Sequence, residues 1–198
     1  KEKVLIKLIN TDILKYYPQR LKLLLEAHNK LIHENIVKTK DIVIVEQYIF
    51  IITEFFENYS LKYLIRDKSL NKKKYEGFFL KIIIQALIGL EYLHCNGLSH
   101  CNMSPDKILI ANNSFGRPNF DNPIVKIWDL DLIKINKTDS YCEWPDYKTF
   151  NIDYASPEQL LHINSLVGAG TDIYSMGLVL YEAIAKRHLM SEHTNTFF

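Results

Sequence analysis

The stretch SHCNMSPDKILI, residues 99–110, decides how the chain is interpreted. A histidine, a turn of small residues, a proline and an aliphatic run follow one another in it. This order suits a loop that carries an active site and then enters a strand. Whether the stretch is an active site, the remains of one or an ordinary loop therefore depends on the rest of the chain.

Composition excludes several classes of protein. The chain has 198 residues, of which 47% are hydrophobic and 24% charged, as in an ordinary soluble globular protein of one domain or two small lobes. A net charge of +1 gives no reason to expect nucleic acid as a partner. The three cysteines have no metal-ligand spacing, so we expect a reducing intracellular compartment, cytoplasmic or nuclear.

Apolar stretches such as YIFIITEFF, residues 48–56, are far shorter than the roughly 18 residues of a membrane span. The first ten residues, KEKVLIKLIN, have only short apolar runs and are not typical of a signal peptide. We therefore expect no membrane span.

Hydrophobic periodicity predicts an α+β chain. Strands are expected at residues 3–9, at two runs within 41–55 around a turn near Glu46 and Gln47, and at 107–110 and 125–128. Helices are expected at 19–32, 60–68, 77–97 and 171–185. Gly97 is the expected left-handed stop of the third helix, and Thr171 the expected cap of the last, which is apolar almost all round. Residues 131–157 show little periodicity.

Seven segments stand in a meaningful order: VLIK (4–7), HENIV (33–37), IITEFFENYSL (51–61), LEYLHCNGLSHCNMSPDKILI (90–110), VKIWDLD (125–131), ASPE (155–158) and DIYSMGLVLYE (172–182). Together they resemble the eukaryotic protein kinase family, nearer its Ser/Thr branch, over essentially the whole chain. The resemblance implies a partial bilobal kinase fold, from the third strand of the small lobe to the central helix of the large lobe. Residues 1–56 would form the partial small lobe and 57–198 the partial helical lobe.

The resemblance also implies a nucleotide site. Lys7 would bind the α- and β-phosphates, and Thr53 would be the gate behind the adenine. The hinge would be Glu54 to Phe56, and Leu109 would be the apolar floor under the base. The family's glutamate partner of the lysine falls near Leu24. Glu26 is the nearest carboxylate, but two residues turn a helix by roughly 200°, so Glu26 should face another way.

The catalytic positions are degenerate. His100 is kept, but Cys101 replaces the family's Arg, Asn102 its catalytic Asp, Ser104 its Lys and Lys107 its metal-binding Asn. An Asn amide has no useful basicity, and losing a positioned general base costs about 10²–10⁴-fold in rate. An ammonium has no lone pair for Mg²⁺, so Lys107 would instead bring a positive charge.

The segment Asp129-Leu130-Asp131 stands where the family has Asp-Phe-Gly. Asp129 would keep the metal-binding carboxylate, whereas Asp131 replaces a glycine whose backbone freedom a side chain lacks. Glu158 and Asp172 match family positions that we interpret as structural. There is no glycine before Gly77, so the chain contains no Gly-rich loop to cover phosphates.

Three classes of function stay open. The first is an inactive pseudokinase that acts as a scaffold or allosteric partner of other proteins, for example an active kinase or a larger assembly, with weak or absent binding of Mg-ATP. The second is an ATP-dependent Ser/Thr-type protein kinase with a rearranged site, in which Asp106 or Asp131 would be the base. The third is a structural fragment that binds no ligand. We favour the first.

Overall fold

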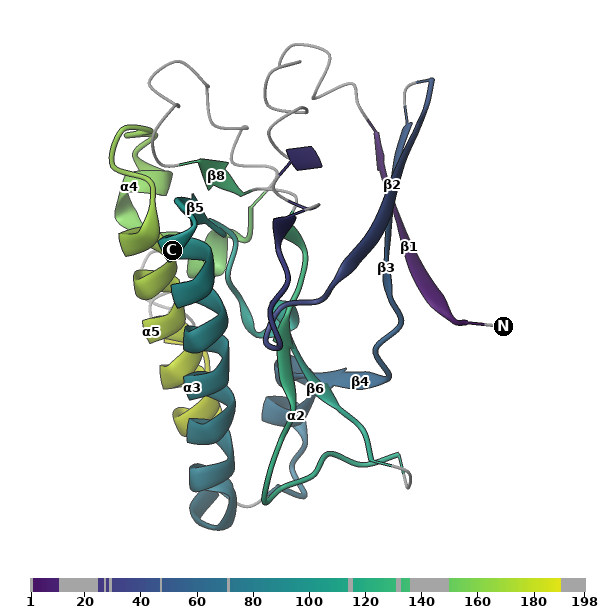
Figure 1. Ribbon diagram of the computed structural model, residues 1–198. Coiled ribbons are helices and arrows are strands. Elements are labelled where there is room, and N and C mark those ends of the chain that lie inside the picture. Colours follow the sequence, from purple (N-terminus) through teal and green to yellow (C-terminus); the bar gives the residue numbers. More distant parts are fainter. Residues whose placement is uncertain are drawn as a thin grey trace.

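The computed structural model describes residues 2–10, 25–26, 28, 30–46, 48–70, 72–113, 116–130, 133–135 and 150–189. A three-stranded sheet forms one part, with β1 (Val4–Asn10), β2 (Thr39–Val45) and β3 (Tyr48–Glu54) in the order β1-β3-β2. A mostly helical part lies on the other side, dominated by α3 (Lys72–Cys95) and α5 (Ala169–Ala185) (Figure 1). This is the expected α+β arrangement of a partial kinase fold.

The sheet is antiparallel, with β3 in the middle. Ile49 and Ile51 of β3 are buried, and the β2–β3 hairpin turns at Glu46, whose φ of 51° is left-handed. The predicted turn is thus confirmed at Glu46, and Gln47 lies outside the described residues. Strand β1 begins and ends one residue later than predicted, and its apolar side chains Val4, Leu5, Ile6 and Leu8 are all exposed.

Short elements surround the junction between the sheet and the helices. They are β4 (Asn58–Ser60), α2 (Leu61–Arg66), β5 (Leu98–Ser99), the 3₁₀ turn η2 (Pro105–Lys107), β6 (Ile108–Ala111), β7 (Val125–Ile127), β8 (Lys134–Ile135), η4 (Ile152–Tyr154) and α4 (Pro157–Leu160). Strands β4, β6 and β7 form a second sheet, and β5 pairs with β8. Helix α2 begins where predicted, because the Ser60 side chain accepts the Tyr63 amide at 3.3 Å.

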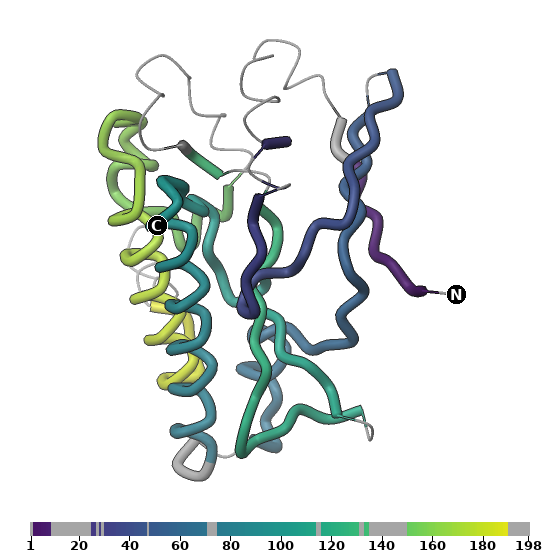
Figure 2. Tube along the Cα trace, viewed as in Figure 1, coloured from purple at the N-terminus to yellow at the C-terminus, as the bar shows by residue number. Residues whose placement is uncertain are grey.

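The core lies between α3, α5 and the second sheet (Figure 2). Helix α3 buries a face through Phe79, Ile82, Ala86, Leu90 and Leu93, which recur at helical spacing. It begins at Lys72, five residues before the predicted start, and Gly97 with φ 73° follows its end as predicted.

Segment Tyr75–Cys95 of α3 has the length and mean hydropathy of a membrane-spanning helix, which differs from our expectation. Packing explains much of this apolar composition, since the face of α3 that contains Ile82 and Leu90 is fully buried in the protein core.

Helix α5 differs from the prediction at its start. Gly168 is the N-cap and Thr171 is the third helical residue, so the predicted cap at Thr171 is wrong. The Thr171 hydroxyl accepts the Gly168 amide at 3.2 Å and donates to Glu158 Oε1 at 2.6 Å. The helix is not buried on all sides either, because Ile173 is 55% and Tyr174 37% exposed.

The segment HENIV joins the two parts of the molecule. Val37 donates its amide to Ile127 O at 2.9 Å, and Ile127 donates to Asn35 O at 2.8 Å, so the segment runs along β7. The Asn35 side chain donates to Val125 O at 2.9 Å. Gly89 of α3 faces this segment so closely that a Cβ atom would lie 2.9 Å from Asn35 O.

We expect Gly89→Ala to destabilise the protein, because the methyl group would displace the backbone of Asn35. Gly77 on the same helix is the matched control. A Cβ there meets nothing within 4 Å, so Gly77→Ala should stabilise the fold by about 0.5–1 kcal/mol through helix propensity alone. Chemical denaturation measures both. Equal effects of the two substitutions would contradict the close packing of α3 on Asn35.

Candidate functional site

A cluster of three charges forms at the junction of the two parts. Lys7 Nζ pairs with Asp129 Oδ1, and Lys107 Nζ pairs with Asp129 Oδ2. The Asp129 side chain is only 7% exposed, whereas Lys7 is 31% and Lys107 19% exposed. Burial alone would raise the pKa of Asp129, but the two ammonium groups hold it well below its usual range. The carboxylate therefore lies beneath two cations that reach solvent.

Strand pairing positions all three residues. Lys7 lies in the middle of β1, opposite Ile51 of β3. The register of β6 and β7 pairs Ile108 with Ile127, which places Lys107 beside the residues that follow β7. Trp128 accordingly donates its amide to Lys107 O at 3.1 Å.

Trp128 forms one wall of the charge cluster. The Lys107 and Lys7 ammonium nitrogens lie 5.3 and 5.7 Å from the centre of its ring. Its indole N–H donates to Asp106 O at 2.9 Å, which fixes the ring. Each ammonium thus contacts a carboxylate oxygen and approaches an aromatic face, which favours cations there.

The turn around His100 is held by one buried carboxylate. Asp172 of α5 accepts the amides of His100 at 2.8 Å and Cys101 at 2.7 Å, and it also contacts His94 Nε2 at 2.8 Å. Cys101 has a left-handed φ of 61°, which a β-carbon disfavours and the bond to Asp172 supports. His100 is fully buried with Nε2 3.0 Å from Trp128 O, and burial lowers its pKa.

Asn102 and Ser104 are the residues that the sequence resemblance matches to the family's catalytic Asp and Lys. The Asn102 side-chain oxygen accepts the Asn151 amide at 3.0 Å, so it ties the loop to the segment before α4. Ser104 is fully buried.

Residues of the implied adenine site lie at the end of β3, directly after it, and in β6. Glu54 accepts the Lys38 amide at 2.9 Å and pairs with Lys126 at 2.8 Å. Burial opposes ionisation of Glu54, but these contacts lower its pKa. Phe56 lies beside Lys126, and Leu109 is half-buried in β6. The segment that follows β3 and strand β6 are close in space, because β4, which comes next in the chain, pairs with β6.

His28 is a site residue that our sequence reasoning missed. With Thr53, Lys7 and Asp129 it lines a cavity of about 20 Å³ behind the charge cluster. His28 is 5% exposed, its Nδ1 lies 2.8 Å from Thr39 Oγ1, and its Nε2 is buried without a partner among the described residues. Leu24 lies outside the described residues and Glu26 is exposed. Spacing in the sequence could have indicated His28, because residues four apart lie on one face of a helix and His28 is four residues after Leu24.

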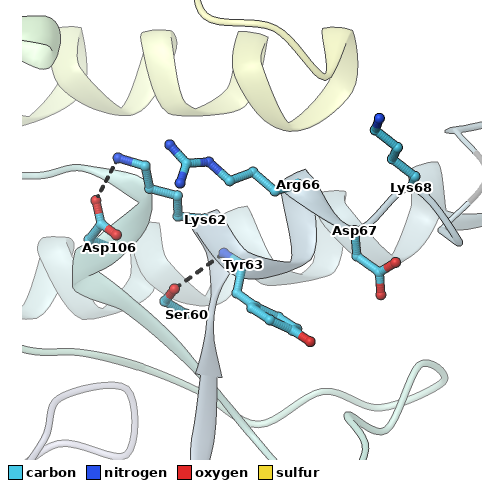
Figure 3. Close-up of a pocket in the computed structure, with 7 residues that line it drawn as sticks. All are labelled: Ser60, Lys62, Tyr63, Arg66, Asp67, Lys68 and Asp106. Carbon is cyan, nitrogen blue, oxygen red and sulfur yellow. Dashed lines mark hydrogen bonds and ion pairs between the residues drawn. The ribbon is translucent and has the colours of Figure 1, made fainter.

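A larger and more open hollow of about 610 Å³ lies beside α2 (Figure 3). Lys62, Arg66 and Lys68 provide cations, and Asp67 and Asp106 provide carboxylates. Lys62 pairs with Asp106 at 3.1 Å, and the Lys62 and Arg66 side chains extend into the same part of the hollow (Figure 3). The hollow is larger than the cavity at Asp129, but it contains none of the three clustered charges. We therefore regard the cluster as the candidate site.

The residues present at Asp129 do not fit a magnesium ion. Both oxygens of Asp129 already bind ammonium groups, and Lys107 offers no lone pair. Within the described residues, no group of three His, Cys, Asp or Glu side chains is placed to hold a metal.

Comparison with known proteins gives the family. The family model "Protein kinase domain" matches residues 1–197, so the chain belongs to the eukaryotic protein kinase superfamily. Its relatives place it on the Ser/Thr branch. It is 27% identical to serine/threonine-protein kinase PknD of Chlamydia pneumoniae over 92% of this chain and 21% of that protein.

Two eukaryotic relatives also match most of this chain and a smaller part of their own length. The chain is 27% identical to cyclin-dependent kinase 7 of Caenorhabditis elegans over 85% of this chain and 45% of the relative. It is 26% identical to the SNF1-like protein kinase ssp2 of Schizosaccharomyces pombe over 94% of this chain and 30% of the relative. The chain thus spans less than half the length of these relatives.

We predict that His28 makes stability depend on pH. Burial and the nearby Lys7 lower its pKa from 6.5 to about 4, while Asp129 opposes the shift. Between these values the unfolded chain binds more protons, so the stabilisation is complete above pH 6.5 and is lost as pH falls toward 4. The loss amounts to roughly 3 kcal/mol at most. Denaturation at pH 7.5 and 5 measures it, and His28→Asn, which keeps an acceptor for Thr39, should flatten the slope. An unchanged slope would refute this assignment.

We predict that Asp172→Ala destabilises the protein by about 3–5 kcal/mol, because two buried amides and His94 would lose their acceptor. Asp121→Ala is the control, since Asp121 is exposed and surface substitutions usually change stability by less than about 0.5 kcal/mol. Thermal and chemical denaturation measure the difference. A small effect at Asp172 would show that the turn does not depend on this carboxylate.

Proposed function

We propose that the chain is a catalytically inactive kinase domain, a pseudokinase, that works by binding other proteins as a scaffold or allosteric partner. Asn102 carries this proposal. A protein kinase needs a carboxylate at this position to orient the substrate hydroxyl and accept its proton. Here an amide stands in its place, and its oxygen is engaged by the Asn151 amide at 3.0 Å.

The second support is the charge cluster. Phosphoryl transfer by kinases depends on metal ions that neutralise the phosphates. Asp129 binds two lysines instead, and one of them, Lys107, stands where the family has its second metal ligand. We therefore propose that Mg-ATP binds weakly or not at all, with Lys7, Thr53, Leu109 and the hinge at Glu54 to Phe56 as its remaining contacts.

The active-kinase alternative needs a displaced base. Asp106 is one candidate, but it pairs with Lys62 at 3.1 Å on the α2 side of the loop. Asp131, the other candidate, lies outside the described residues. The ion pair of Asp106 with Lys62 therefore supports an inactive kinase domain over an enzyme with a rearranged site.

Binding to proteins is the role that remains for a kinase fold without transfer chemistry, and it is proposed here from that reasoning. An intracellular, reducing location fits the thiols of Cys95 and Cys101, neither of which is in a disulfide, and the similarity of the chain to Ser/Thr kinases.

We predict no transfer of radiolabelled phosphate from ATP to protein substrates, or to the chain itself, above background. The missing base alone should lower the rate by about 10²–10⁴-fold. The full-length protein should be assayed beside Asp129→Ala and the surface variant Arg66→Ala, and all three should match the blank. Activity that disappears in Asp129→Ala and survives in Arg66→Ala would refute the proposal and favour the rearranged enzyme.

A further inference from the structure

We propose that Lys7 and Lys107 together form a metal-independent binding site for a phosphate chain, in which the Lys107 ammonium replaces the metal ion. The inference rests on the proposed inactive kinase domain and names the ligand class of the same site: pyrophosphate-type anions, either free or as part of a nucleotide.

The arrangement of exposure is the first argument. Asp129 is 7% exposed, and the two lysines that bind its opposite oxygens are 31% and 19% exposed. An anion that approaches from solvent therefore meets two ammonium groups before it meets the carboxylate. Among the three clustered side chains the two positive charges outnumber the one negative charge, which favours the approach of an anion.

The chemistry of the donors is the second argument. An ammonium has three N–H donors, and the contact of Lys107 with Asp129 Oδ2 uses one of them. A lysine is a point charge suited to a polyanion, and hydrogen bonds between charged groups are about twice as strong as neutral ones. The two ammonium groups bind different oxygens of one carboxylate, so they are close enough together to contact one phosphate chain.

The cavity behind the cluster sets the direction of binding. Its volume of about 20 Å³ is enough for roughly one water molecule, so no phosphate can enter between His28 and Asp129. Trp128 occupies a further side of both ammonium groups. The anion must therefore bind on the solvent side of Lys7 and Lys107.

Isothermal titration calorimetry of the full chain with pyrophosphate tests this proposal, once in EDTA and once with Mg²⁺. We expect binding in EDTA, with no gain from Mg²⁺. Lys107→Met keeps the apolar stem but removes the charge, and should weaken binding by about 10- to 100-fold. Lys107→Arg keeps the charge and should retain binding. Binding by Lys107→Arg would show that the site tolerates substitution at residue 107, so the loss in Lys107→Met can be assigned to the missing charge.

Two further variants separate this site from its alternatives. Asp129→Asn should retain or strengthen binding, because it removes the carboxylate charge that both ammonium groups bind, whereas it would abolish binding through a metal. Arg66→Met removes one charge from the α2 hollow and should change nothing. ATP and AMP in EDTA distinguish the source: binding of ATP but not AMP identifies the phosphate chain, and tighter binding of ATP than of tripolyphosphate adds the base.

The proposal is overturned if wild-type binding requires Mg²⁺, if no binding occurs in EDTA, if Lys107→Met binds like wild type, or if Arg66→Met loses binding. Loss of binding in Asp129→Asn would overturn it too. These outcomes leave the proposed inactivity standing, because that is decided by phosphate transfer. Transfer activity would overturn the proposed function whatever the calorimetry shows.

Discussion

The structure around the site depends on the carboxylate of Asp172. It is fully buried, and a buried charge costs several kcal/mol unless donors satisfy it. Three donors do so: the amides of His100 and Cys101 and the ring of His94. These contacts connect α5 to the end of α3 and to the loop at residues 99–107. They also support the left-handed backbone at Cys101, which determines how the rest of the loop leaves the core.

This anchor acts on backbone groups, and it explains how the fold persists while the chemistry changes. The amide of Cys101 binds Asp172 whatever its side chain is. Core packing of α3 and α5 is likewise independent of the side chains at residues 102 and 107, which are not part of the hydrophobic core and contact Asn151 and Asp129 instead. Asn102 gains a structural contact with Asn151 in place of a catalytic one. The proposed loss of a base and of a metal ligand is therefore compatible with a kinase fold.

Periodicity predicted the β2–β3 hairpin, α3 and α5, because each is long enough to repeat its pattern. It did not predict β4, β5 or β8, which have only two or three residues, although the equally short β7 was predicted from its run of apolar residues. Sequence reasoning recognised that Lys107 removes a metal ligand. It did not show that Lys107 reaches Asp129 beside Lys7, because that contact depends on the register of β6 and β7. His28 was missed for the same reason: its surroundings come from distant segments.

Replacing a metal ligand by lysine changes when the positive charge is present. A metal ion must be bound from solution, together with the nucleotide that completes its coordination. Lys107 is covalently part of the chain and already lies against Asp129 before any ligand arrives. A preorganised cation reduces what a ligand loses in freedom on binding. Yet an ammonium carries one charge and accepts no ligand oxygen into a coordination shell, so it cannot bridge phosphates as a divalent ion does. The same substitution therefore favours holding an anion and opposes transferring it.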